Sequence, residues 1–212
     1  MSTEEHWVSR RIGIQPTAAP TEKLSTKSVL DEATRPSAPE PPPEVTFSQR
    51  GRYAGQHLVD VHDHYRAELR QLRDLLQQVK DGTMKLGDAR DQINMMTIRA
   101  NDWTLGGVCQ AHCRALTMHH TMESGQIFPH LRSRQHDLAA VLDRLHEEHL
   151  AIHEVLESVD AALVHLARNP TDYGPITEAV DLLTDTLLSH FAYEERELIG
   201  PLARHGFFAG QV

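Results

Sequence analysis

The sequence predicts an all-α protein, an antiparallel up-down four-helix bundle preceded by a disordered N-terminal tail. Four stretches of the chain carry apolar residues at alternating steps of three and four, the period of a helix that buries one face. The second and third connections between these stretches are short, as they are when neighbouring helices run antiparallel. No stretch shows the strict apolar and polar alternation that marks a half-buried strand.

The N-terminal residues differ in composition from the rest of the chain. The segment "TAAPTEKLSTKSVLDEATRPSAPEPPPEV" is rich in Pro, Ser, Thr and Glu, and it has few apolar side chains to offset the entropy that is lost on ordering. We therefore expect a disordered, Pro-rich tail over residues 1–46 and a folded bundle over residues 53–205.

The four predicted helices span about residues 53–80, 105–124, 136–167 and 175–204. The first ends at the Asp81-Gly82 signal and the third before Asn169-Pro170, because Gly and Pro commonly follow the last helical turn. Pro175 suits the first turn of the fourth helix. Residues 83–103 form a connector that is long for a bundle, with room for a short helix.

The charge balance argues against two classes of partner. The chain has 21 Lys and Arg against 30 Asp and Glu, a net charge of −9, which disfavours nucleic acid and anionic membrane surfaces. No apolar run approaches a membrane span, and the N-terminus lacks a signal-peptide pattern, so we expect a cytoplasmic protein. Cys109 and Cys113 form neither a disulfide framework nor a CxxC motif, and we expect both to be reduced core residues.

Histidine is the outlier in the composition, with 15 copies spread from His6 to His205. Near the middle of each predicted helix a histidine or a glutamate interrupts the apolar face, although an unpaired buried polar group costs several kcal/mol. On the first helix the interrupting residue is His64. The other three helices carry pairs spaced four apart, which share one helix face: His119 and Glu123, His149 and His153, and His190 and Glu194.

These polar residues are also predicted to lie at one height in the bundle. If the chain reverses near residue 136, Glu123 and His149 are each about 13 residues from the turn. A reversal near residue 171 puts His153 and His190 about 18 and 19 residues from that turn. Independent core histidines have no reason to share a height. We therefore predict one inward-facing cluster of five imidazoles and two carboxylates, enough for two metal ions.

The donor types narrow the choice of metal. Imidazole together with carboxylate suits iron, zinc, copper or manganese, and no set of thiolates competes for the site. Glutamates on opposite helices can each bridge two ions. Ferritin-like bundles use Glu-x-x-His, which these helices lack. Neutral imidazoles leave the metal pair with more positive charge than a carboxylate-rich shell does, so we expect binding or sensing rather than oxidation.

The pattern of His64, "HHTME" with "IFPHL", "EEHLAIH" and "HFAYEEREL" resembles the hemerythrin-like, HHE cation-binding domain of the bacterial type. The resemblance covers about residues 53 to 205. It implies two non-haem iron ions, in preference to zinc or manganese, which are bridged by two carboxylates and an oxo or hydroxo group. The implied ligands are His64, His119, Glu123, His149, His153, His190 and Glu194, with Glu123 and Glu194 as the bridges.

The resemblance implies a protein that binds O2 or a related small oxidant (NO, peroxide) for sensing, storage or stress defence. One alternative is a peroxide-removing, catalase-like enzyme. A second alternative is a regulatory or interaction module that a redox-silent metal such as zinc stabilises. Oxygen-carrying hemerythrins space the last pair as His-x-x-x-x-Asp, so Glu195 competes with Glu194; we favour Glu194 because it shares the apolar face.

Neighbouring histidines remain as alternative ligands. On the first helix His57 and His62 compete with His64, although we expect His62 to be a flanking or surface residue. On the second helix His120 is one step away from the favoured face, and we expect it to support a ligand or to lie on the surface.

Overall fold

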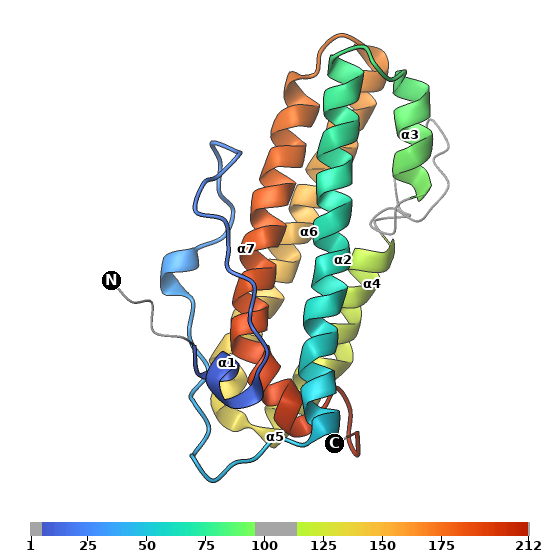
Figure 1. Ribbon diagram of the computed structural model, residues 1–212. Helices are drawn as coiled ribbons and strands as arrows, with labels where there is room; N and C mark the ends of the chain where they lie inside the picture. Colours follow the sequence, from blue (N-terminus) through green and yellow to red (C-terminus); the bar gives the residue numbers. More distant parts are fainter. Residues whose placement is uncertain (1–5, 96–113, 212) are drawn as a thin grey trace.

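The computed structural model describes residues 6–95 and 114–211, and long helices dominate it (Figure 1). Helices α2 (Gln49–Lys80), α4 (Arg114–Met122), α6 (Ala139–Arg168) and α7 (Gly174–His205) run alternately up and down the bundle. The described residues contain no strand. The predicted all-α, antiparallel four-helix bundle is therefore confirmed. Among the described helices, none combines the length and apolar character that crossing a bilayer requires.

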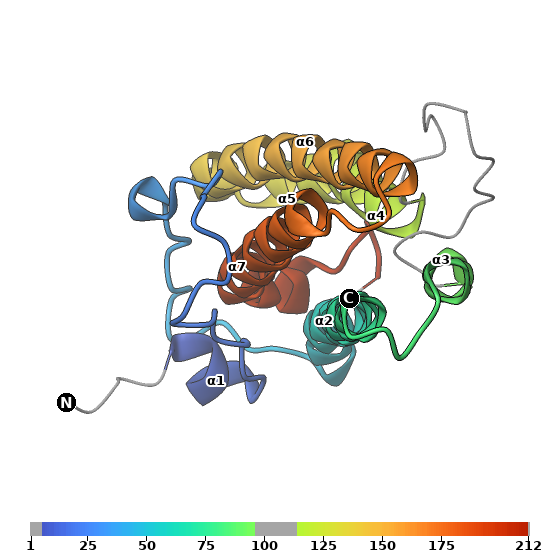
Figure 2. The same ribbon diagram turned by 90° about the horizontal axis from the view of Figure 1, so that it is seen from above.

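Helix α7 is the central element of the bundle. It packs against both α2 and α6, and in the view from above it lies between them (Figure 2). Apolar residues surround most of its circumference, as expected for a helix that is buried on all sides. The hydroxyls of Thr184 and Thr186 are buried as well, and each donates to the carbonyl four residues earlier.

The apolar core is divided into two clusters along the bundle axis. One cluster includes Leu69, Ile152 and Leu183, toward the α6–α7 connection. The other includes Leu142 and Leu198, toward the opposite end. The polar layer predicted from the sequence lies between these clusters, because the helices carry their histidines and glutamates where the two apolar stretches meet.

The second helix of the bundle extends further toward the C-terminus than the sequence predicts. We expected it to end near Gly125, but α4 continues through a π-helical turn (Glu123–Ile127) into α5 (Phe128–Arg134). Pro129 lacks the N–H that a regular α-helix would bond to the carbonyl four residues earlier, and the wider π turn accommodates this loss. Such turns are frequent at functional sites, and this one begins at Glu123.

The other helix ends agree with the sequence. Gly82 follows α2 with a φ of +70°, a conformation that suits glycine, and Pro175 occupies the first turn of α7. The connector contains the expected short helix, α3 (Leu86–Met95). Cys109 and Cys113 lie outside the described residues.

Residues 6–46 form an ordered arm along the bundle, where we expected a disordered tail (Figures 1 and 2). The arm begins with α1 (Trp7–Ile12). Its Trp7, Val8 and Ile12 are buried in the core cluster that includes Leu142 and Leu198. A Cβ atom added at Gly200 of α7 would lie 2.2 Å from the Trp7 ring, so the indole packs directly on the α7 backbone.

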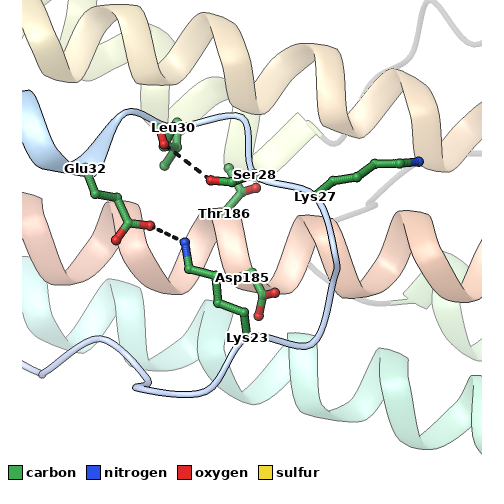
Figure 3. Close-up of a pocket in the computed structure, with 7 residues that line it drawn as sticks. All are labelled: Lys23, Lys27, Ser28, Leu30, Glu32, Asp185 and Thr186. Atoms are coloured by element: carbon green, nitrogen blue, oxygen red, sulfur yellow. Dashed lines mark hydrogen bonds and ion pairs between the residues drawn. The ribbon is translucent and has the colours of Figure 1, made fainter.

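Polar contacts fix the rest of the arm to α7. The backbone N–H groups of Leu24 and Ser25 donate to the carboxylate of Asp185, both at 2.8 Å, and the N–H of Ala38 donates to Glu197. The segment from Lys23 to Leu30 forms the outer loop of the arm, and a short 3-10 turn (Glu32–Thr34) follows it. Between this loop and α7 lies a hollow with room for about one water molecule (Figure 3). It is too small to be a ligand site.

Candidate metal centre

Seven buried or nearly buried side chains form two adjacent groups in the polar layer between the two core clusters. One group consists of His120, His149 and His190; the other consists of His62, His119, Glu123 and Glu194. Within each group the ligand atoms lie within 4.8 Å of one another. Helices α2, α4, α6 and α7 and the π-helical turn all contribute residues, so the bundle as a whole builds the centre.

The two glutamates connect the groups. The two carboxylate oxygens of Glu123 lie 3.2 Å from Nε2 of His119 and 3.6 Å from Nε2 of His149. Oε2 of Glu194 lies 3.4 Å from Nε2 of His62 and 3.4 Å from Nε2 of His190. Each carboxylate therefore approaches one histidine of each group.

The inner atoms of the centre lack hydrogen-bond partners among the residues that the structure describes. This holds for Nε2 of all five histidines, for Oε2 of Glu123 and for both carboxylate oxygens of Glu194. Glu194 is fully buried, and such atoms are costly to bury without a partner. Buried imidazoles that present an Nε2 without a hydrogen-bond partner toward neighbouring ligand atoms are typical of a metal site.

The structure brings together five of the seven residues that the sequence analysis proposed as ligands: His119, Glu123, His149, His190 and Glu194. It does not bring His64 or His153 into either group. The side chain of His64 is 55% exposed and approaches Glu68, and that of His153 is 43% exposed and approaches Glu157.

The two groups instead include His62 and His120. We expected His62 to be a flanking or surface residue, but its side chain is fully buried and belongs to the second group. His120 is 7% exposed, and its ring stacks on that of His149 with 4.1 Å between centroids. The register of α2 explains the first exchange, since Leu58, His62 and Tyr65 follow one buried face.

Hydrogen bonds at the outer nitrogen orient three of the five imidazoles. Nδ1 of His190 is 3.0 Å from Glu148, and Nδ1 of His62 is 2.9 Å from Glu195. Nδ1 of His149 is 2.9 Å from the hydroxyl of Ser124. Ligating histidines usually make such a bond with the nitrogen that does not face the metal. Glu148 and Ser124 were not identified from the sequence, and Glu195 was considered only as a bridge.

Burial and the neighbouring charges set the protonation of the metal-free centre. Burial lowers the pKa of His119 to about 3 and holds those of His120 and His149 well below the usual value, so these imidazoles are neutral. Burial also lowers the pKa of His190, but its hydrogen bond with Glu148 and the nearby carboxylate of Glu194 outweigh this effect and raise the pKa to about 9. Burial beside Glu194 raises the pKa of Glu123 well above the usual value.

Aromatic rings pack against three of the five imidazoles. The ring of Phe191 stacks on His62 with 4.2 Å between centroids, and Phe128 stacks on His149 at 5.5 Å. Tyr65 is buried beside His119, with 5.6 Å between the ring centroids.

The donor set fits a pair of metal ions. Two ligand atoms that are each bound at about 2.0–2.2 Å to one ion lie about 3 Å or slightly more apart, which matches the separations of 3.2–3.6 Å between the carboxylate oxygens and imidazole nitrogens. These pairs approach each other without hydrogen-bond geometry, as co-ligands do.

The fold and this centre together define a metal-binding four-helix bundle protein. In comparisons with known proteins, residues 54–202 match the family described as the hemerythrin HHE cation binding domain. The match covers more than half of the chain, and the chain therefore belongs to the hemerythrin family. No curated protein and no solved structure matched the chain. Family membership confirms the resemblance and the predicted cation binding.

Proposed function

We propose that this chain is a non-haem di-iron protein that binds O2 or a related small oxidant (NO, peroxide) for sensing, storage or stress defence. The observation that carries the proposal is the pair of glutamates, Glu123 and Glu194, that each approach one histidine of both groups. A carboxylate shared between two neighbouring sets of imidazoles is the arrangement expected for a bridge between two ions.

The proposed ligands are His62, His119, His120, His149, His190 and the two bridging glutamates. The two groups are unequal: the first has three imidazoles and the second has two. If both glutamates bridge, one position receives five donors and the other receives four. Iron in comparable sites of histidine and carboxylate has positions open to a small ligand. When bound, iron would supply these positions and reversible redox chemistry.

The surrounding residues would hold the donors and limit access to them. Glu148 and Glu195 accept hydrogen bonds from the outer nitrogens of His190 and His62, which fixes the ring orientations and makes the inner nitrogens better donors. Phe191 and Phe128 cover the rings of two proposed ligands with apolar surface, so water is excluded from their faces. This environment favours a small, uncharged ligand such as O2 or NO.

The test is reconstitution of the metal-free protein with ferrous iron under anaerobic conditions. We expect two irons per chain, and on admission of O2 a new charge-transfer band in the visible spectrum. Fewer than one iron per chain, or two irons with an unchanged spectrum, would contradict the proposal.

The same sample separates the two alternatives. Turnover of hydrogen peroxide well above that of free iron would indicate the catalase-like enzyme instead of a binding protein. Strong preference for zinc over iron, with no spectral change in O2, would indicate a module that the metal only stabilises.

A further inference from the structure

We propose that the N-terminal arm is part of the metal centre: Arg35 and the backbone of Thr17 hold the two carboxylates that orient His190 and His62. This inference rests on the proposed function and extends it to residues 6–46, which lie outside the matched family region. Arg35 and Thr17 are positioning groups, since each acts through a glutamate rather than on the metal itself.

The first contact joins the arm to the group of three histidines. The guanidinium of Arg35 donates to both oxygens of Glu148, at 2.7 Å and 3.0 Å, and the second of these oxygens also bonds Nδ1 of His190. The same guanidinium donates to the hydroxyl of Ser189 at 2.9 Å and lies over the ring of Tyr193. The forked geometry leaves Glu148 a single orientation toward His190.

The contact between Arg35 and Glu148 is also shielded from water. The side chains of Arg35 and Glu148 are 8% and 3% exposed. A carboxylate that is screened from water and held at both oxygens keeps one position, in which it accepts the hydrogen bond from the imidazole. Without the guanidinium, Glu148 would lose this fixed position, and His190 would lose its fixed orientation.

The second contact joins the arm to the other group. The backbone N–H of Thr17 donates to one oxygen of Glu195 at 2.8 Å, and the other oxygen bonds Nδ1 of His62. Arg66 of α2 forms an ion pair with that second oxygen at 2.7 Å. Glu195 is therefore fixed from two sides, by α2 and by the arm, and its side chain is fully buried.

One contact precedes the outer loop of the arm in the chain and the other follows it, and the loop itself is attached to α7. The backbone N–H groups of Leu24 and Ser25 donate to Asp185 in the first part of the loop, and the hydroxyl of Tyr193 donates to the carbonyl of Pro36 after it. The arm is thus attached along the side of α7 that carries Asp185 and Tyr193. We infer that displacing the arm lowers metal affinity at both positions.

The experiment uses the full-length, metal-free protein and Co²⁺ as the probe, because its visible spectrum reports coordination without O2 chemistry. Co²⁺ binding is measured by titration and by competition with a chelator. In Arg35→Met we expect one of the two Co²⁺ ions to bind about 10–100-fold more weakly, the usual effect of losing an outer partner of a metal ligand. Arg35→Lys keeps the charge without the fork and should fall between Arg35→Met and wild type.

Matched controls separate positioning from general effects. Arg10→Met removes the same charge from the arm at a residue that pairs with Glu40, and it should bind Co²⁺ like wild type. Thr17→Pro removes the N–H that Glu195 accepts and should weaken one Co²⁺ site, whereas Thr17→Ala keeps the N–H and should not. Circular dichroism and thermal melting of each metal-free variant establish that it is folded.

The outcomes distinguish this inference from the proposed function. If wild type binds fewer than two Co²⁺ ions, the two-metal centre itself is refuted. If wild type binds two, and folded Arg35→Lys and Thr17→Pro bind them with unchanged affinity and spectrum, the role of the arm alone is refuted. Should Arg35→Met not fold, the Arg35→Lys and Thr17→Pro results decide in the same way.

Discussion

Replacing Glu123 with methionine should stabilise the metal-free protein while it destroys the metal centre. Glu123 is 2% exposed, its Oε2 has no hydrogen-bond partner among the described residues, and burial beside Glu194 raises its pKa well above the usual value. A buried, unsatisfied polar group costs about 1–3 kcal/mol. Methionine has a similar volume and an adaptable side chain, so Glu123→Met removes this cost without opening a cavity.

The expected gain is about 1–2 kcal/mol in the free energy of unfolding, after allowing for lost contacts with His119 and Glu194. In a chain of this size each kcal/mol shifts the melting temperature by about 2–4 °C, so Tm should rise by about 2–8 °C in the presence of a chelator. With saturating metal, the wild-type protein should instead be more stable than Glu123→Met. At a metal concentration of 1,000 times Kd, each site lost removes about 4 kcal/mol of stabilisation.

Urea unfolding followed by circular dichroism, with a chelator and then with Zn²⁺, measures both effects. Glu147→Met is the matched control, because the Glu147 side chain is 65% exposed and the change should stay within about 0.5 kcal/mol. A metal-free Glu123→Met protein that is less stable than wild type by more than about 1 kcal/mol would show that Glu123 stabilises the bundle, and the reasoning from its unsatisfied burial would fail.

His120→Ala should lower bound iron from two ions per chain toward one, whereas His153→Ala keeps two; equal iron in both variants would refute the exchange of ligands inferred from the structure. Gly200→Ala should destabilise the protein by about 1–3 kcal/mol in urea unfolding, because the added Cβ would lie 2.2 Å from Trp7. By contrast, a Cβ at Gly125 meets open space, and Gly125→Ala should raise the free energy of unfolding by about 0.5–1 kcal/mol. A Gly125→Ala protein that is less stable than wild type would contradict this prediction. Removing metal from the wild-type protein with a chelator should lower Tm, and calorimetry that shows no change would argue against a metal that binds tightly to the folded state.

The bundle was predictable because its helices carry a continuous apolar face. On α6 and α7 the predicted faces, including Leu142, Ile152, Leu183 and Leu198, are buried in the structure. The same periodicity placed His190 toward the interior. Where a helix has one unambiguous apolar face, the polar residues within that face could be identified from spacing alone.

On α2 the spacing allowed two registers, and the sequence analysis followed the wrong one. Val61 and Glu68 suggested that His64 faces inward, whereas the buried positions are Leu58, His62 and Tyr65. The pattern of Leu58, His62, Tyr65, Leu69 and Leu72 was present in the sequence, at steps of four, three, four and three. Including histidine and tyrosine as core-facing residues would have identified it.

The second helix shows a different limit. From the sequence we assigned one inward face to each helix, so we predicted His119 as a ligand and placed His120 off that face. In the structure the two neighbouring histidines serve different groups, His119 beside Glu123 and His120 beside His149. A helix that approaches two adjacent metal positions can use consecutive residues, which a single-face pattern does not anticipate.

The composition of the N-terminal residues did not indicate that they form an ordered arm. Several of its contacts with α7 are backbone N–H groups that donate to carboxylates, such as those from Thr17 to Glu195 and from Ala38 to Glu197. Backbone donors are the same in every sequence, so these bonds leave no compositional trace. The spacing of Trp7, Val8 and Ile12 was the available signal for an ordered N-terminal helix.

The central claim is that two metal ions occupy one centre and that Glu123 and Glu194 bridge them. Anomalous diffraction at the iron edge from crystals of the iron-loaded protein tests it most directly. We predict two neighbouring anomalous peaks, one beside His120, His149 and His190 and the other beside His62 and His119, with both glutamates between them. A single peak, or a peak beside His64 or His153, would contradict the account.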